Sequence, residues 1–190
     1  MVVVCPATLS PEPPVNRPLR VILRADAGVV TGTGHVMRCL TIGEELRARG
    51  HEAVLLGALD GVEWLARRVV ETGIRHTAVE AGDLRPETMD ASADVVIVDS
   101  YSIAADDIAL LNERVPVVAI IDGDDRGIRA SAYLDSNLEV ATYPARVAER
   151  VWGGSRFALV RRELRELRRL PGRSLPASPT VLCVMGGSDP

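Results

Sequence analysis

Lysine is absent from this chain of 190 residues, and all 22 basic residues are arginines. A Walker A loop uses a lysine to reach the phosphates of a nucleotide, so that class of nucleotide-binding protein is excluded. Cysteine is scarce as well, and the three that occur, at positions 5, 39 and 183, share no CxxC spacing. This spacing argues against a disulfide framework and against a zinc site. We therefore predict no bound metal, and no cofactor is indicated.

Long apolar runs and an excess of positive charge are also absent. No run approaches the ~18 residues that a transmembrane helix requires, and the apolar start at residues 1–5 is too short for a signal peptide. The formal net charge of −4 argues against a nucleic-acid surface. The sequence therefore predicts a cytoplasmic protein that spans no membrane and binds no nucleic acid.

Apolar runs alternate with amphipathic segments along most of the chain. Only six residues are aromatic, although 47% are hydrophobic, so the core must consist mainly of Val, Leu, Ile and Ala. The pattern predicts strands at 20–24, 53–56, 76–79, 95–98, 117–121 and 133–135. It predicts helices at 35–49, 61–72, 86–91, 106–114 and 161–169. Such alternation is typical of an α/β fold, here a Rossmann-like parallel sheet with helices on both faces.

Proline and glycine divide the chain into four parts. Residues 1–18 contain five prolines and are predicted to be a disordered leader. Residues 19–170 form the N-terminal Rossmann-like domain, and the Pro- and Gly-rich stretch 171–179 is a linker. Residues 180–190 form an apolar strand followed by a Gly-Gly turn. Because this pattern normally opens a βα unit, we expect it to begin a C-terminal domain that is truncated in this chain.

A glycine-rich turn connects the first predicted strand to the first predicted helix. It contains Gly32-Thr33-Gly34 and is followed directly by His35. Glycine permits positive φ and close approach of a ligand, and a helix N-terminus presents unpaired N–H groups and partial positive charge. Such a turn suits a phosphate or sugar hydroxyls. The helix dipole favours a neutral imidazole at His35, which could act as a general base.

Two other interpretations of the turn stay open. The first is a dinucleotide fingerprint, but Met37 stands where the third glycine of GxGxxG belongs, and no acidic residue closes the second strand. The second is a tight strand–helix connection in which His35 only caps the helix.

Two further strands end in polar residues. Asp99-Ser100-Tyr101 follows one strand, and an aspartate-rich turn at 122–125 follows the next. Ligands of parallel sheets bind outside the carboxyl ends of the strands, so these loops and the glycine turn could face one pocket. Alternatively, Asp99 and Tyr101 merely end a strand. The aspartates at 122–125 fit a turn at least as well as a metal site, because no ordered set of ligands accompanies them.

Five motifs follow one another over roughly residues 20–190. They are Arg24-Ala25-Asp26 with the run 32–40, then Val98-Asp99-Ser100-Tyr101, Ile121-Asp122, the segment 154–163, and Met185-Gly186-Gly187-Ser188-Asp189, with Tyr143 between the third and the fourth. Together they resemble the UDP-sugar hydrolases of pseudaminic acid biosynthesis and the related spore-coat polysaccharide glycosyltransferase-like proteins. The resemblance implies that this chain is the N-terminal lobe of a GT-B two-domain fold.

The resemblance also implies a reaction and its residues. In the hydrolases, the glycine-turn histidine activates water for attack at the anomeric carbon of a UDP-linked diacetamido-trideoxy sugar, and UDP leaves with inversion. By position, the catalytic residues would be His35, Tyr101 and Asp99. The substrate-binding residues would be Arg24, Asp26, Gly32, Thr33 and Gly34 in this lobe, and Gly186, Gly187, Ser188 and Asp189 at the start of the other lobe.

We therefore expect a UDP-sugar hydrolase that requires the missing C-terminal domain of the same chain as its partner. That domain holds most of the uridine and diphosphate in the family, so this fragment alone should be inactive. One alternative is a GT-B glycosyltransferase in which His35 deprotonates an acceptor hydroxyl instead of water. Another is a non-catalytic nucleotide-sugar-binding module.

Overall fold

The computed structural model describes residues 17–84, 92–138, 141–167 and 178. Almost all of the predicted leader and linker, the predicted helix 86–91 and the whole of 180–190 lie outside the described residues. The substrate-binding residues predicted there, Gly186, Gly187, Ser188 and Asp189, lie outside them as well.

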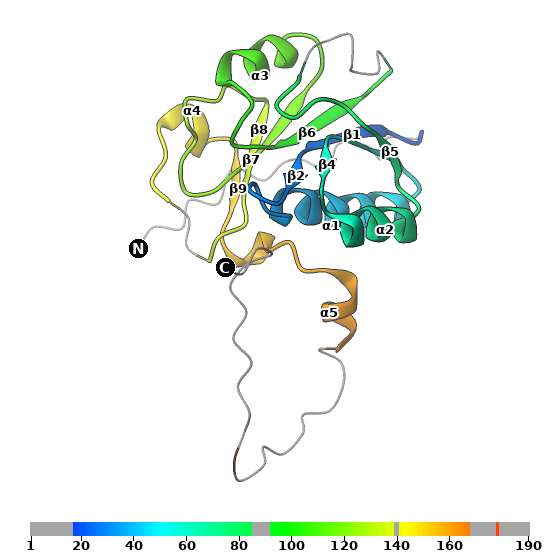
Figure 1. Ribbon diagram of the computed structural model, residues 1–190. Coiled ribbons are helices and arrows are strands. Elements are labelled where there is room, and N and C mark those ends of the chain that lie inside the picture. The colour runs from blue at the N-terminus through cyan, green and yellow to red at the C-terminus, as the bar shows by residue number, and fades with distance from the viewer. Residues whose placement is uncertain (1–16, 85–91, 139–140, 168–177, 179–190) are drawn as a thin grey trace.

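A seven-stranded sheet, parallel throughout, forms the centre of the molecule (Figure 1). Its strands in chain order are β1 (Arg20–Ala25), β3 (Glu52–Leu56), β5 (Arg75–Thr77), β6 (Val95–Asp99), β7 (Val117–Ile121), β8 (Ala132–Asp135) and β9 (Val151–Gly153). In space the order is β5-β3-β1-β6-β7-β8-β9. The chain therefore starts at the centre, builds outward to one edge, and then crosses back to build the other half. This is the strand order of a Rossmann-like fold.

Helices cover both faces of the sheet, as the alternating pattern predicts. The described helices are α1 (Gly34–Ala48), α2 (Glu63–Thr72), α3 (Ala105–Asn112), α4 (Ala145–Ala148), the 3₁₀ helix η2 (Ser155–Phe157) and α5 (Arg162–Leu167). In Figure 1, α1 and α2 lie on one face and α3 lies on the other. The described helices are all too short or too polar to cross a bilayer.

The central strands are mostly apolar because both of their faces are buried, and their charged residues, such as Arg24 in β1 and Asp99 in β6, lie at or near the strand ends. In β1, Ile22 packs into one core with Ile108 of α3, whereas Leu23 packs into the opposite core with Leu40 of α1. Successive side chains of a strand point to opposite faces, so one short run of apolar residues supplies both cores. The sheet is thereby fixed between two helical layers.

Gly57, directly after β3, allows an unusually close approach of two chain segments. A Cβ at this position would lie 1.7 Å from the carbonyl oxygen of Ala25. Only glycine fits there, and the contact holds the end of β3 against the end of β1.

The differences from the sequence prediction lie in the shortest elements. A two-stranded sheet of β2 (Ala27–Gly28) and β4 (Leu59–Asp60) was not predicted, and neither were α4, β9 and η2. The third strand is at 75–77 instead of 76–79. Elements of two to four residues are too short to show a clear helical or alternating pattern, so their presence and bounds are hard to predict from the sequence.

Candidate functional site

The carboxyl ends of the parallel strands bring the three predicted polar loops to one edge of the sheet. Ala25, at the end of β1, is directly paired with Asp99, at the end of β6. This is the point where the strand order reverses, with the first half of the sheet on one side of β1 and the second half on the other. In doubly wound folds, ligands bind in the crevice at this switch point.

His35 and Asp99 meet at that switch point. The Nδ1 atom of His35 lies 2.7 Å from Oδ1 of Asp99, although the two residues are 64 positions apart in the sequence. His35 is 8% exposed and Asp99 is 1% exposed. The ring is therefore largely buried, at the start of α1, with a carboxylate on one of its two nitrogens.

The contact between His35 and a charged Asp99 indicates which ring nitrogen carries the proton. A carboxylate can only accept, so Nδ1 of His35 donates to Asp99 and the proton of the neutral ring resides on Nδ1. The other nitrogen, Nε2, then holds a lone pair, and none of the described residues makes a hydrogen bond to it. The arrangement can accept a proton at Nε2 while Asp99 stabilises the resulting positive charge.

Arg38, one turn further along α1, binds both oxygens of the same carboxylate. Its Nε donates to Oδ2 of Asp99 at 2.7 Å, and its Nη2 donates to Oδ1 at 2.9 Å. Nη2 also lies 3.1 Å from Nδ1 of His35. Burial lowers the pKa of Arg38, but the hydrogen bond and the charge of Asp99 outweigh it, so the net pKa is raised.

Tyr101 lies against His35 and forms the exposed side of the group. The two rings meet edge to face with their centres 4.7 Å apart and an angle of 84° between their planes. Tyr101 is 58% exposed, and its hydroxyl donates to Oδ2 of Asp122 at 2.8 Å. Burial of the hydroxyl and its bond to Asp122 both raise the pKa of Tyr101, so the phenol stays protonated.

Asp122 is held by donors from two different loops. Tyr101 donates to one carboxylate oxygen, and Nδ2 of Asn137 donates to the other at 2.8 Å. These two bonds lower the pKa of Asp122.

A second tyrosine–aspartate pair lies at the end of the neighbouring strand, β8. The Tyr143 hydroxyl donates to the buried Asp135 at 2.6 Å. Burial and the Asp135 carboxylate both raise the pKa of Tyr143. The polar edge thus extends from β6 across β7 to β8.

Arg126 covers the face of Tyr101. Its guanidinium carbon lies 4.9 Å from the centre of the ring, within the range of a cation–π contact. Its Nη2 donates to the carbonyl oxygen of Ser100 at 2.6 Å. The backbone of Arg126 has φ +47°, a conformation that non-glycine residues rarely adopt, and the backbone N–H donates to the side chain of Asp124.

The glycine turn is closed by its own backbone. Gly28 and Gly32 exchange two backbone hydrogen bonds, with N to O distances of 3.3 and 2.8 Å, and Gly32 has φ +74°. Thr33 precedes the helix, but its side chain makes no capping hydrogen bond there. No described atom would lie within 4 Å of a Cβ at Gly32 or Gly34. The surface of the turn is therefore open in front of the start of α1.

Arg24 and Asp26 were predicted to bind substrate, but in the structure their side chains bind each other and the surrounding backbone. Arg24 is 0% exposed, and it donates to Oδ1 of Asp26 at 2.6 Å and to the carbonyl oxygen of Asp83 at 2.8 Å. Asp26 also accepts from the backbone N–H groups of Ala58 and Gly82, both at 2.9 Å. This geometry does not support the prediction that the two side chains bind substrate.

Three residues of this edge were missed as functional candidates. They are Arg38, Arg126 and Asn137. A sequence signal existed for Arg38, because positions three apart on a helix share a face and His35 is three positions earlier. Asp122 lies in a loop that was predicted to face the pocket, but it was interpreted as part of a turn and received no role. Arg126 and Asn137 reach the site only through tertiary contacts, and no local pattern identifies them.

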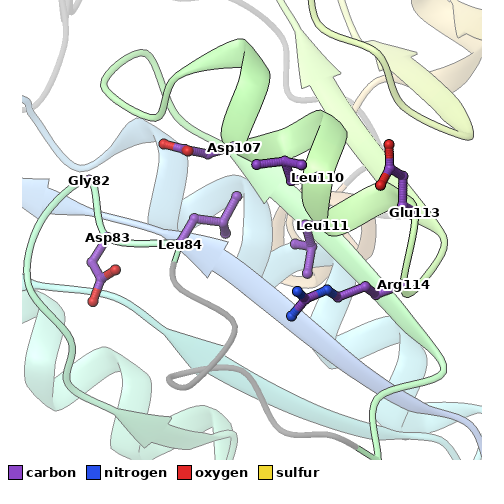
Figure 2. A pocket seen from close by; sticks show the side chains of 8 residues that line it. All are labelled: Gly82, Asp83, Leu84, Asp107, Leu110, Leu111, Glu113 and Arg114. Carbon is purple, nitrogen blue, oxygen red and sulfur yellow. The ribbon is translucent and has the colours of Figure 1, made fainter.

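No group of three or more His, Cys, Asp or Glu that could hold a metal ion occurs among the described residues. A cavity of about 250 Å³ lies between α3 and the loop that ends at Leu84 (Figure 2). Leu84, together with Leu110 and Leu111 of α3, contributes apolar side chains to its lining, and Arg114 lines it as well. None of the residues predicted for the site lines it. The chain that continues from Leu84 lies outside the described residues, so we assign no ligand to this cavity.

Comparison with known proteins adds no relative to this description. A scan against protein-family models gives no match, and a search of the curated proteins gives none either.

Proposed function

We propose that this chain carries the catalytic base of a nucleotide-sugar enzyme and that its reaction is hydrolysis of a UDP-sugar. The observation that supports this most directly is the hydrogen bond between His35 and Asp99 at the switch point of the sheet. The sequence resemblance to UDP-sugar hydrolases supports the choice of substrate. In this proposal the chain acts as the N-terminal lobe of a GT-B fold, with a second lobe holding most of the UDP.

The proposed step begins with a water molecule at Nε2 of His35. Nε2 takes a proton from the water as the water oxygen bonds to the anomeric carbon. The bond from that carbon to the diphosphate oxygen breaks, and its electron pair leaves with UDP, so the configuration at carbon inverts. Asp99 stabilises the imidazolium that forms. General-base assistance of this kind accounts for a factor of ~10² to 10⁴ in rate.

The surroundings of His35 suit this reaction. The open N-terminus of α1 offers backbone N–H groups to a sugar hydroxyl or a phosphate oxygen. Tyr101, with its hydroxyl directed to Asp122, forms a wall beside the imidazole on the exposed side. The guanidinium of Arg126 lies over that wall and adds positive charge near the site of a departing diphosphate.

The test uses a protein that combines this lobe with the second lobe that the proposal requires, since uridine and diphosphate are held mainly by the C-terminal domain in the resembling family. UDP release is measured with a panel of UDP-sugars that includes a UDP-linked diacetamido-trideoxy sugar. We expect release without any acceptor. Release only when an acceptor alcohol is present would indicate a glycosyltransferase, and binding without release would indicate a binding module.

A pair of histidine variants tests the role of the base. His35→Ala should reduce UDP release by about two to four orders of magnitude, the usual contribution of a general base. The matched control is His51→Asn, because the Nδ1 atom of His51 only accepts a hydrogen bond from the backbone of Leu19, which an asparagine oxygen can replace. A His35→Ala variant that is as active as the control would refute the proposed role.

A further inference from the structure

Arg38 contacts both members of the His35–Asp99 pair, whereas an ordinary ion-pair partner would contact only the carboxylate. It binds both oxygens of Asp99 from within the same helix that carries His35. The Asp99 side chain is almost fully buried, whereas that of Arg38 is partly exposed. Arg38 is therefore the cation that compensates this buried carboxylate, and it approaches from the solvent side.

The orientation of Asp99 depends on this contact. Two parallel N–H donors of a guanidinium match the two oxygens of a carboxylate and fix its plane. With Nε on Oδ2 and Nη2 on Oδ1, the carboxylate presents Oδ1 to Nδ1 of His35 at 2.7 Å. A rotation of the carboxylate would break both bonds to Arg38.

Loss of Arg38 would leave a buried carboxylate without its cation. A buried charge without a partner tends to be neutralised by taking up a proton. A protonated Asp99 could then donate a hydrogen bond to Nδ1 of His35, since a carboxylic acid has an O–H donor. The ring proton would move to Nε2, and the lone pair that the base requires would be lost.

We propose that Arg38 is a positioning residue that sets the tautomer of His35, by holding Asp99 as a carboxylate whose Oδ1 accepts from Nδ1. The importance of Arg38 for catalysis rests on the proposed function, whereas its effect on the tautomer of His35 does not. Nothing in the resemblance or in the predicted catalytic group assigns this role to Arg38.

The experiment measures the tautomer directly in this chain labelled with ¹⁵N. Two-bond ¹H–¹⁵N correlation spectra distinguish protonated from unprotonated ring nitrogens, and only three histidines have to be assigned. For the unmodified chain, we expect neutral His35 to have its proton on Nδ1. In Arg38→Met, the ratio of the Nδ1–H form to the Nε2–H form should fall at least about tenfold, the effect of losing a hydrogen bond between charged groups.

Two further variants make the result specific. Arg38→Lys retains the positive charge but cannot bind both oxygens with the same fork geometry, so the ratio should lie between those of the unmodified chain and of Arg38→Met. Arg49→Met removes an exposed arginine from the other end of α1, where it pairs only with Glu45, and should leave the His35 signals unchanged.

The outcomes separate this inference from the proposed function. An unchanged Nδ1–H signature in a folded Arg38→Met chain would overturn the role of Arg38. If that variant does not fold, Arg38→Lys decides, and a ratio equal to that of the unmodified chain would overturn it. The NMR measurement of the tautomer needs no substrate. If Arg38→Met shows the expected tautomer shift but the UDP-sugar assay of the unmodified protein shows no UDP release, only the proposed function is refuted.

Discussion

Replacing Arg24 with methionine should destabilise the fold by about 3 kcal/mol, the lower end of the cost of breaking a buried ion pair. The guanidinium of Arg24 is 0% exposed and donates to Asp26 at 2.6 Å, to Asp83 at 2.8 Å and to the carbonyl oxygen of Leu56 at 3.4 Å. Methionine fills a similar volume but donates no hydrogen bond, so these oxygens would lose a partner.

The estimate is at the lower end because Asp26 would keep part of its hydrogen bonding. The backbone N–H groups of Ala58 and Gly82 still donate to its two oxygens, each at 2.9 Å. Burial raises the pKa of Asp26, but Arg24 and these two N–H groups outweigh it, and the net pKa is lowered. Without Arg24, the carboxylate would be weakly compensated but not left without any donor.

Urea unfolding followed by circular dichroism at 222 nm measures this loss. The control is Arg49→Met, which removes an exposed arginine from a surface pair and should change the free energy of unfolding by less than ~0.5 kcal/mol. If Arg24→Met lost less than ~1 kcal/mol and instead weakened UDP-sugar binding in the proposed two-lobe protein, the structural role would be refuted and the original assignment to the substrate restored.

Two further predictions concern stability. Gly57→Ala should destabilise the fold by ~3 kcal/mol or more, because the new methyl group would lie 1.7 Å from the carbonyl oxygen of Ala25; Gly34→Ala, which meets no described atom within 4 Å, should be nearly neutral in the same urea titration. The hydrogen bonds from Arg17 and from the backbone of Arg20 lower the pKa of Asp94 from 3.8 to about 2. Its stabilisation is complete above pH 3.8 and is lost as the pH falls toward 2, so the difference in stability between the unmodified chain and Asp94→Asn should shrink over that interval. A difference that grows toward pH 2 would contradict this sign.

Part of the candidate site follows from local sequence, and part does not. The alternation of strands and helices predicted that the glycine turn before His35 and the loop at 99–101 share the carboxyl edge of a parallel sheet, and the family resemblance supplied the catalytic roles. The structure brings His35, Asp99 and Tyr101 together. Arg126 and Asn137 could not be predicted, since they reach Tyr101 and Asp122 through loops of irregular conformation.

The buried pair of Arg24 and Asp26 shows why residue type alone is a weak guide to function. Both belong to the first motif that resembles the UDP-sugar hydrolases, and that resemblance assigned them to the substrate. Yet the segments 56–58 and 80–83 make hydrogen bonds to them, and their charges compensate each other inside the protein. Only the enclosure by distant segments distinguishes a structural ion pair from one that is open to a ligand.

The sequence by itself determined the alternation of strands and helices and the α/β class, because burial on two faces requires strands that are mostly apolar, and this requirement is visible locally. The tertiary structure decided which strand ends are neighbours. By placing β1 between β3 and β6, it brought Asp99 to His35 across 64 residues, set Arg38 on the same carboxylate, and enclosed Arg24. The pairing of β1 with both strands is a long-range choice that depends on how the two cores pack, and no window of sequence contains it.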